Sequence, residues 1–224
     1  MLDNLLSTIA PHYCSSCGKI GTLLCQKCKN YIISHPYSSC IICHSLSGYV
    51  NLCFKHRTPY EKAWCVSERK DAVEKLIDNL KFERKRASCY VLAELLAARL
   101  PELPTSTQIV PIPTAPKNVR MRGYDHMLLV SERLAKNRNL PITPLLSRRS
   151  NDIQHFAPDR QTRLKQAKNF FEINPKYLDQ IDEKASYLLV DDIFTSGATI
   201  NAAANCLKAA GVTNISVAII ARQR

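Results

Sequence analysis

The feature that most constrains this chain is a run of paired cysteines near its start. Seven of its ten cysteines lie within residues 14–53. Four of them form two Cys-x2-Cys pairs, Cys14 with Cys17 and Cys25 with Cys28, separated by seven residues. A two-residue spacer lets one tight turn direct two sulfur atoms at one ion, and tetrahedral Zn²⁺ accepts four such ligands. This spacing predicts a structural zinc site.

A second group of ligands follows with a similar spacing. Its members are Cys40, Cys43, Cys53 and His56. An imidazole nitrogen is an accepted substitute for the fourth thiolate. His35 or His44 could replace His56, and the first and third pairs could share one ion, but sequential pairing needs only short loops. Because residues 1–60 show little regular hydrophobic periodicity, we expect two Zn²⁺ ions to supply much of their folding energy, on the order of 10 kcal/mol per ion.

The start of the chain and its composition indicate the compartment. Residues 1–4 lack the basic flank of a secretory signal, and the longest apolar runs are far below the ~20 residues that span a bilayer. We therefore expect a cytoplasmic protein without membrane insertion. Thiols stay reduced in that compartment, which favours metal ligation over disulfides.

After residue 60 the pattern changes to alternating strands and helices. The expected strands are 63–66, 108–112, 142–146, 187–190 and 215–220, and the expected helices are 71–82, 90–100, 127–137 and 199–210. Such alternation predicts an α/β fold with a parallel sheet flanked by helices on both faces. We expect two domains, a small Cys-rich zinc-binding module at 1–60 and a larger α/β domain at 61–224.

The residue pattern that most clearly indicates a binding site runs from Tyr187 to Thr199 and reads YLLVDDIFTSGAT. A buried strand delivers Asp191 and Asp192 at its carboxyl end, where open α/β sheets bind ligands. The following turn opens a helix whose free N–H groups suit a phosphate, and Gly197 permits close backbone approach. Adjacent carboxylates suit two vicinal hydroxyls or a hydrated Mg²⁺ ion. A five-carbon sugar phosphate satisfies both halves of this pattern.

This stretch resembles the phosphoribosyl pyrophosphate (PRPP) signature of type I phosphoribosyltransferases, and it matches over thirteen positions. The resemblance implies that Asp191 and Asp192 hold the ribose hydroxyls and that Mg²⁺ accompanies PRPP. It further implies a cradle for the 5′-phosphate made by Thr195, Ser196, Gly197, Ala198 and Thr199.

Cysteine pairs before such a domain resemble the ComF family, which includes competence proteins and GntX-like proteins. Residues 76–82, LIDNLKF, are similar to the family's LI-x-x-LK-F helix, and 110–113 with 120–125 are similar to its VPVP…R-x-RG-F-N-Q segment. Asp125 and His126 depart from the family's Asn-Gln. We expect these two residues to form a solvated loop pair rather than to act on an acceptor.

The same resemblance implies a site for the pyrophosphate. The peptide bonds at Val110, Pro111, Ile112 and Pro113 are expected to present N–H groups to it. Three cations, Lys117, Arg120 and Arg122, follow on a segment expected to be mobile. No residue is an evident acid or base for a known acceptor, so catalytic residues stay unassigned.

The net charge of +12 is spread unevenly, because the basic excess falls mainly in residues 61–181. Candidate contacts to nucleic acid are Lys81, Arg84, Lys85, Arg86, Arg148, Arg149, Arg160, Arg163, Lys165 and Lys168. A cationic track with aromatic platforms is typical of single-stranded nucleic acid binding, although solvated helix faces carry the same residues. The family resemblance implies natural transformation, with single-stranded DNA and DNA-uptake proteins as partners. The alternative is an active phosphoribosyltransferase that transfers phosphoribose to a nitrogen acceptor and releases pyrophosphate.

Overall fold

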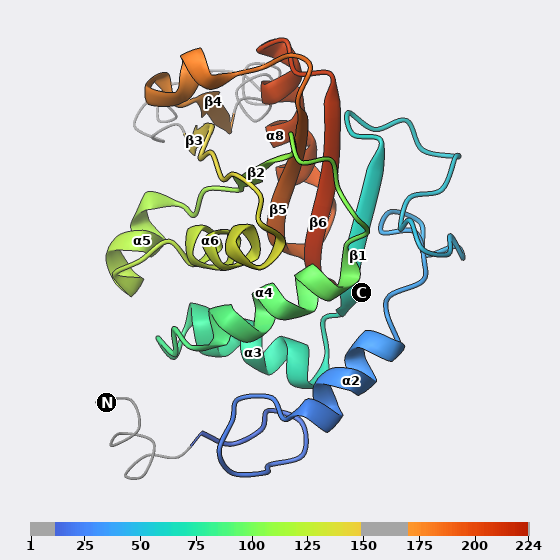
Figure 1. The fold of residues 1–224 in the computed structure, drawn as a ribbon, viewed down its shortest axis with the longest axis vertical. Helices are drawn as coiled ribbons and strands as arrows, with labels where there is room; N and C mark the ends of the chain where they lie inside the picture. The colour runs from blue at the N-terminus through green and yellow to red at the C-terminus, as the bar shows by residue number, and fades with distance from the viewer. Residues whose placement is uncertain (1–11, 149–169, 224) are drawn as a thin grey trace, which may run out of the picture.

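The computed structural model of the protein describes residues 12–148 and 170–223, and its centre is a four-stranded sheet (Figure 1). The strand order is β1-β6-β5-β2, and all three pairings are parallel. The strands are β1 (Lys62–Glu68), β2 (Gln108–Pro111), β5 (Ser186–Phe194) and β6 (Asn214–Arg222). The predicted α/β fold with a parallel sheet is confirmed.

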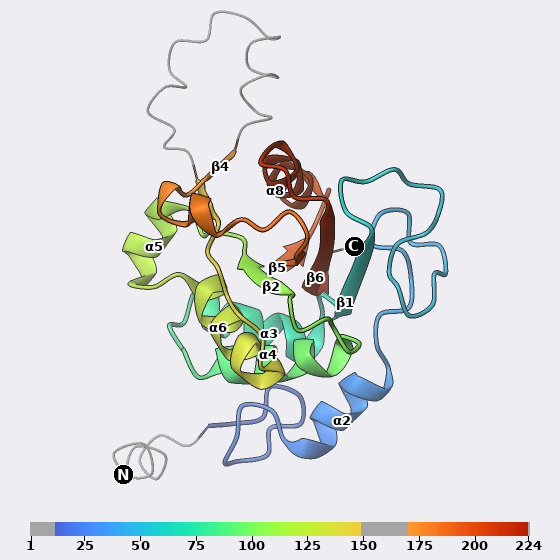
Figure 2. The same ribbon diagram turned by 45° about the horizontal axis from the view of Figure 1, so that its top comes forward.

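Helices cover both faces of this sheet (Figure 2). Helices α3 (Asp71–Lys81), α4 (Ser88–Arg99) and α6 (His126–Arg138) share one core with Leu188 and Val190 of β5. Helix α8 (Ala198–Ala209) shares the other core with Leu189, because successive residues of a strand point to opposite faces. Burial on both faces explains why β5 reads as an apolar run. None of the helices at residues 12–148 and 170–223 is long and apolar enough to cross a membrane.

The remaining elements are short. They are α2 (Gln26–Ser34), α5 (Pro116–Arg122), β3 (Leu146–Arg148), β4 (Phe171–Ile173) and the 3-10 helix η2 (Pro175–Gln180). The strand expected at 142–146 is reduced to a single bridge between Ile109 and Ile142, and β3 pairs antiparallel with β4 instead. The segment after Pro113 contains a helix over 116–122, with a proline at its first position and Gly123 as its C-cap.

The Cys-rich segment packs directly against the α/β part. Leu24 and Cys25 belong to the core on the α3 side of the sheet, whereas Tyr37 and Ile41 belong to the core on the α8 side. The fully buried Asn51 joins the two parts: its Nδ2 donates to the Tyr37 carbonyl at 2.7 Å, and its Oδ1 accepts from Cys65 N at 2.7 Å. Both parts thus contribute side chains to the same two cores. The division into two domains at residue 60 stays a prediction.

Candidate functional site

The first four cysteines converge on one point. The Sγ atoms of Cys14, Cys17, Cys25 and Cys28 all lie within 4.8 Å of one another. The Cys17 and Cys25 sulfurs are 3.7 Å apart, close to the ~3.8 Å that two ligands 2.3 Å from a tetrahedral Zn²⁺ would show and far beyond a disulfide bond. Burial would raise the pKa of Cys14, but hydrogen bonds from backbone N–H groups, chiefly that of Cys25, lower it to about 6. Cys14 itself therefore favours the thiolate that a metal requires.

The second group converges in the same way. Its ligand atoms, from Cys40, Cys43, Cys53 and His56, lie within 4.8 Å of one another, and the Cys43 and Cys53 sulfurs are 3.7 Å apart. Hydrogen bonds from Ser45 and His56 lower the pKa of Cys43 to about 5. Among the described residues, the buried Nε2 of His56 has no hydrogen-bond partner, which fits a metal ligand. Both groups could thus hold structural metal ions, and their ligands are those of zinc.

The geometry favours one of the alternatives for the second group. His44 contacts Tyr37 and Arg222 through its two ring nitrogens, and His35 contacts the Tyr31 carbonyl. Neither imidazole belongs to the ligand cluster, and the pairing is sequential.

The two acids of β5 form the centre of a separate site. Asp191 and Asp192 are 8% and 7% exposed, and the N–H of Asp192 donates to Asp191 Oδ1 at 2.9 Å. Burial and the neighbouring charge of Asp192 raise the pKa of Asp191. Burial would also raise the pKa of Asp192, but a hydrogen bond from His126 and the charge of Lys81 hold it well below its usual range. The pair therefore favours one protonated and one ionised carboxyl group.

Basic side chains from four different elements surround this pair. Asp192 Oδ2 accepts from Lys81 Nζ at 2.6 Å and from His126 Nε2 at 2.5 Å. Arg122 Nη1 lies 3.1 Å from His126 Nδ1, and Arg148 on β3 is close enough to lower the pKa of Asp191. The site thus combines two carboxyl groups with three permanent cations and an imidazole, a set suited to a ligand that carries both hydroxyls and phosphates.

One sequence expectation is corrected at this point. Asp125 and His126 are not a solvated pair, because Asp125 caps α6 by accepting from the N–H groups of Met127 and Leu128 while His126 is 7% exposed. Of the three cations expected on one mobile segment, Arg122 is buried, whereas Lys117 and Arg120 are exposed on α5.

The predicted phosphate cradle forms a turn between β5 and α8. Gly197 is the N-cap of α8 with φ 79° and has no side chain to cap the helix, while the N–H of Ala198 donates to Ser196 Oγ at 3.4 Å. A Cβ at Gly197 would meet Phe194 Cζ at 2.6 Å, so only glycine fits. Thr195, Ser196 and Ala198 are exposed, and Thr199 is partly so. A helix N-terminus with exposed hydroxyls beside two acids can bind a phosphate.

The expected donors to pyrophosphate at 110–113 are not free. The N–H of Ile112 donates to the Val190 carbonyl at 2.9 Å, and Pro111 and Pro113 have no N–H to offer. Val110 lies within β2, paired with Leu189 of β5. This segment lines the same sheet edge as the acids, but its backbone is occupied by the sheet.

Among the described residues, the candidate nucleic-acid contacts divide between an exposed loop and the surroundings of the acid pair. Arg84, Lys85 and Arg86 are exposed in the loop between α3 and α4, close to Phe82, which is 64% exposed. Lys81 turns instead to Asp192, and Arg148 donates to the Pro113 carbonyl at 2.8 Å. Arg149, Arg160, Arg163, Lys165 and Lys168 lie outside the described residues.

Sequence reasoning missed Lys81 and His126 as partners of Asp192. The signals were the departure of Asp125-His126 from the family pattern and the place of Lys81 in the LI-x-x-LK-F helix. The contact of His126 joins residues 66 positions apart, which no local pattern reveals.

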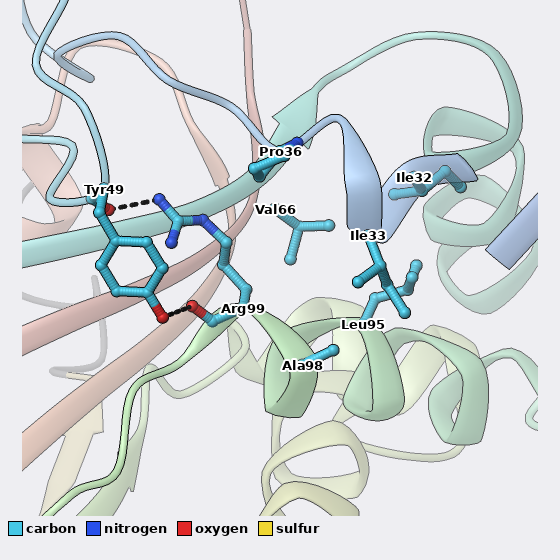
Figure 3. Close-up of a pocket in the computed structure, with 8 residues that line it drawn as sticks. All are labelled: Ile32, Ile33, Pro36, Tyr49, Val66, Leu95, Ala98 and Arg99. Atoms are coloured by element: carbon cyan, nitrogen blue, oxygen red, sulfur yellow. Dashed lines mark hydrogen bonds between the residues drawn. The ribbon is translucent and has the colours of Figure 1, made fainter. Parts of the chain in front are cut away.

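A small cavity of about 70 Å³ lies apart from these acids, between α2, α4 and β1 (Figure 3). Its walls are mostly apolar, and Tyr49 and Arg99 close one end of it. Arg99 Nη2 donates to the Tyr49 carbonyl at 2.5 Å, and the Tyr49 hydroxyl donates to the Arg99 carbonyl at 2.9 Å. These two bonds attach the loop between Cys43 and Cys53, which contains Tyr49, to α4.

Comparison with known proteins supports the motif analysis. No family model matches the chain. Competence protein F of Haemophilus influenzae is 26% identical to it over 210 residues, which cover 89% of this chain and 90% of that protein. The similarity therefore includes both the Cys-rich segment and the α/β part. With two metal-ligand clusters in front of a parallel sheet, it confirms the resemblance of this chain to the ComF family.

Proposed function

We propose that the protein binds PRPP with Mg²⁺ at the end of β5 and acts in natural transformation, where it engages single-stranded DNA and proteins of the uptake machinery. The observation that carries the proposal is the junction of β5 and α8. Two buried acids there precede a helix that is capped by Gly197, and its first N–H, that of Ala198, meets only the exposed hydroxyl of Ser196 at 3.4 Å. The name of the relative, competence protein F, supports the cellular role.

The site offers a distinct group to each part of PRPP. Asp191 and Asp192 suit the ribose hydroxyls, and the turn from Thr195 to Thr199 suits the 5′-phosphate. Lys81, Arg122 and Arg148 supply positive charge for the pyrophosphate, which Mg²⁺ would share. The N–H groups of 110–113 either pair within the sheet or are absent because the residue is proline. We therefore assign the binding of the pyrophosphate to side chains.

Single-stranded DNA is proposed to contact the loop between α3 and α4. Three adjacent cations, Arg84, Lys85 and Arg86, are exposed there, and the exposed ring of Phe82 can stack on a base. Arg84 donates to the Met121 carbonyl at 2.9 Å, and so the loop lies against α5, which exposes Lys117 and Arg120. A surface of this kind attracts phosphates with little sequence preference.

The alternative function is catalysis, in which phosphoribose passes to a nitrogen acceptor and pyrophosphate leaves. The cations beside the acids favour it, because fixed positive charge near a departing pyrophosphate stabilises the charge that develops there. A colorimetric assay of pyrophosphate release from Mg²⁺–PRPP, with a panel of nucleobases and with single-stranded DNA, separates the two functions. Turnover with a base identifies an enzyme, whereas binding without turnover favours PRPP as a ligand or regulator.

The DNA role is tested by salt dependence. Fluorescence anisotropy with a labelled single-stranded oligonucleotide should show affinity that falls steeply between about 50 and 200 mM salt. Replacing Arg84, Lys85 and Arg86 by glutamine should weaken binding and flatten this slope. Absence of binding at low salt, or affinity that is insensitive to salt, would contradict the proposed surface.

A further inference from the structure

Asp192 is held by two helices that are far apart in the sequence. Lys81 is the last residue of α3, and His126 is the first residue of α6. Their Nζ and Nε2 atoms both contact Oδ2 of Asp192, at 2.6 and 2.5 Å. The three side chains are only 15%, 8% and 10% exposed, so water competes little for these contacts.

The orientation of His126 follows from its other neighbours. Its Nδ1 lies 3.1 Å from Arg122 Nη1, which can only donate. Nδ1 therefore accepts, and the proton of the neutral ring sits on Nε2, where it is donated to Asp192. Thr114 Oγ1, 2.8 Å from the same Nδ1, also contacts Asp125 Oδ1 at 2.8 Å and can donate its single proton there. The ring is thus fixed by groups on both sides.

Both donors use one oxygen of Asp192 and leave the other one available. Among the described residues, Oδ1 of Asp192 has no hydrogen-bond partner, and the same is true of Oδ2 of Asp191. We propose that Lys81 and His126 are positioning residues for the ribose site: they hold Oδ2 of Asp192 so that its Oδ1 faces a sugar hydroxyl. This inference rests on the proposed function, because it assumes that the acids bind the sugar.

A purely structural role explains the arrangement less well. Helix α3 is already secured by Leu76, Ile77 and Leu80, and α6 by Met127 and Val130, all buried in the core. Buried ion pairs add little net stability, because desolvation of the charges offsets their attraction. Their value here lies in fixing the direction and charge of one carboxylate, as supporting hydrogen bonds do in other binding sites.

The test combines changes in the protein with changes in the sugar. Binding of ribose 5-phosphate and of 2,3-dideoxyribose 5-phosphate is measured by ligand-observed NMR for the wild type, Lys81→Met, His126→Leu and His126→Gln. The control is Lys75→Met, since Lys75 is exposed on the same helix α3. Thermal unfolding of each variant verifies that it is folded.

The proposal predicts a loss that depends on the hydroxyls. Lys81→Met and His126→Leu should each weaken ribose 5-phosphate binding by about 10-fold or more, as expected for losing a hydrogen bond to a charged group. Binding of the dideoxy sugar should not change. His126→Gln should recover most of the affinity, because its amide can still donate to Asp192, and Lys75→Met should match the wild type.

Two other results would overturn the proposal. If Lys81→Met and His126→Leu bind ribose 5-phosphate as the wild type does, or weaken both sugars equally, the two residues do not position the carboxylate for a hydroxyl. In that case the phosphoribosyl site itself still stands. If the wild type binds neither sugar phosphate, the site assignment fails and the positioning role fails with it.

Discussion

Gly197 provides a sharp test of how the phosphate turn is built. Its φ of 79° lies in the left-handed region, which costs an alanine about 1 kcal/mol. A Cβ would also lie 2.6 Å from Cζ of Phe194. That ring is 3% exposed and stacks against Arg222, whose Cζ lies 5.3 Å from the ring centroid, so it cannot move freely. Such overpacking adds about 1–3 kcal/mol.

The expected loss for Gly197→Ala is therefore about 2–4 kcal/mol, measured by urea unfolding. Gly123→Ala is the matched control, because its φ is 83° and a Cβ there would meet nothing within 4 Å. Gly123→Ala should cost only about 1 kcal/mol. Gly197→Ala should also weaken PRPP binding, whereas Gly123→Ala should not. Equal stability losses in the two variants would refute the steric argument, since both share the same backbone conformation.

Three further outcomes follow from the metal groups and the acid pair. Metal analysis should return close to two zinc ions per chain, and a value near zero would contradict both clusters. Cys28→Ser and His56→Ala should each reduce the content to near one. Because the pKa of Asp191 is raised, the folded protein keeps a proton that the unfolded chain has lost, and this lowers stability as the pH rises above ~4. Relative to the wild type, Asp191→Asn should therefore gain stability from pH 5 to pH 8, by at most about 1.4 kcal/mol per pH unit, in urea unfolding. A difference that is constant with pH would argue against a protonated Asp191.

Much of the fold could be predicted because its signals are local. The apolar runs at 187–190 and 215–220 mark the central strands, and the amphipathic pattern at 71–82 marks α3, which ends at Lys81. The two ligand clusters could also be predicted, because a Cys-x2-Cys spacing brings two sulfur atoms to one side of a tight turn. The repeated turn could have been recognised too. Gly18 and His44 each follow the first cysteine of a pair by four residues, and both have positive φ.

Other features depend on distant contacts and were not predictable. Helix α5 is only seven residues long and rich in basic residues, so it lacks a clear apolar face. The buried role of His126 arises only when α6 is packed beside β5, and Lys81 looks like one more cation in a basic stretch until α3 is placed. Sequence patterns identified the two acids of the site, but not Lys81 and His126, which contact Asp192.

The most direct test of the account is a calorimetric titration of PRPP in the presence of Mg²⁺, with the wild type and the variant carrying Asp191→Asn and Asp192→Asn. Both substitutions keep the size of the side chains while removing the two carboxylates at the end of β5. The account predicts saturable binding by the wild type and none by a folded double variant. Equally tight binding by the double variant would contradict the assignment of this site.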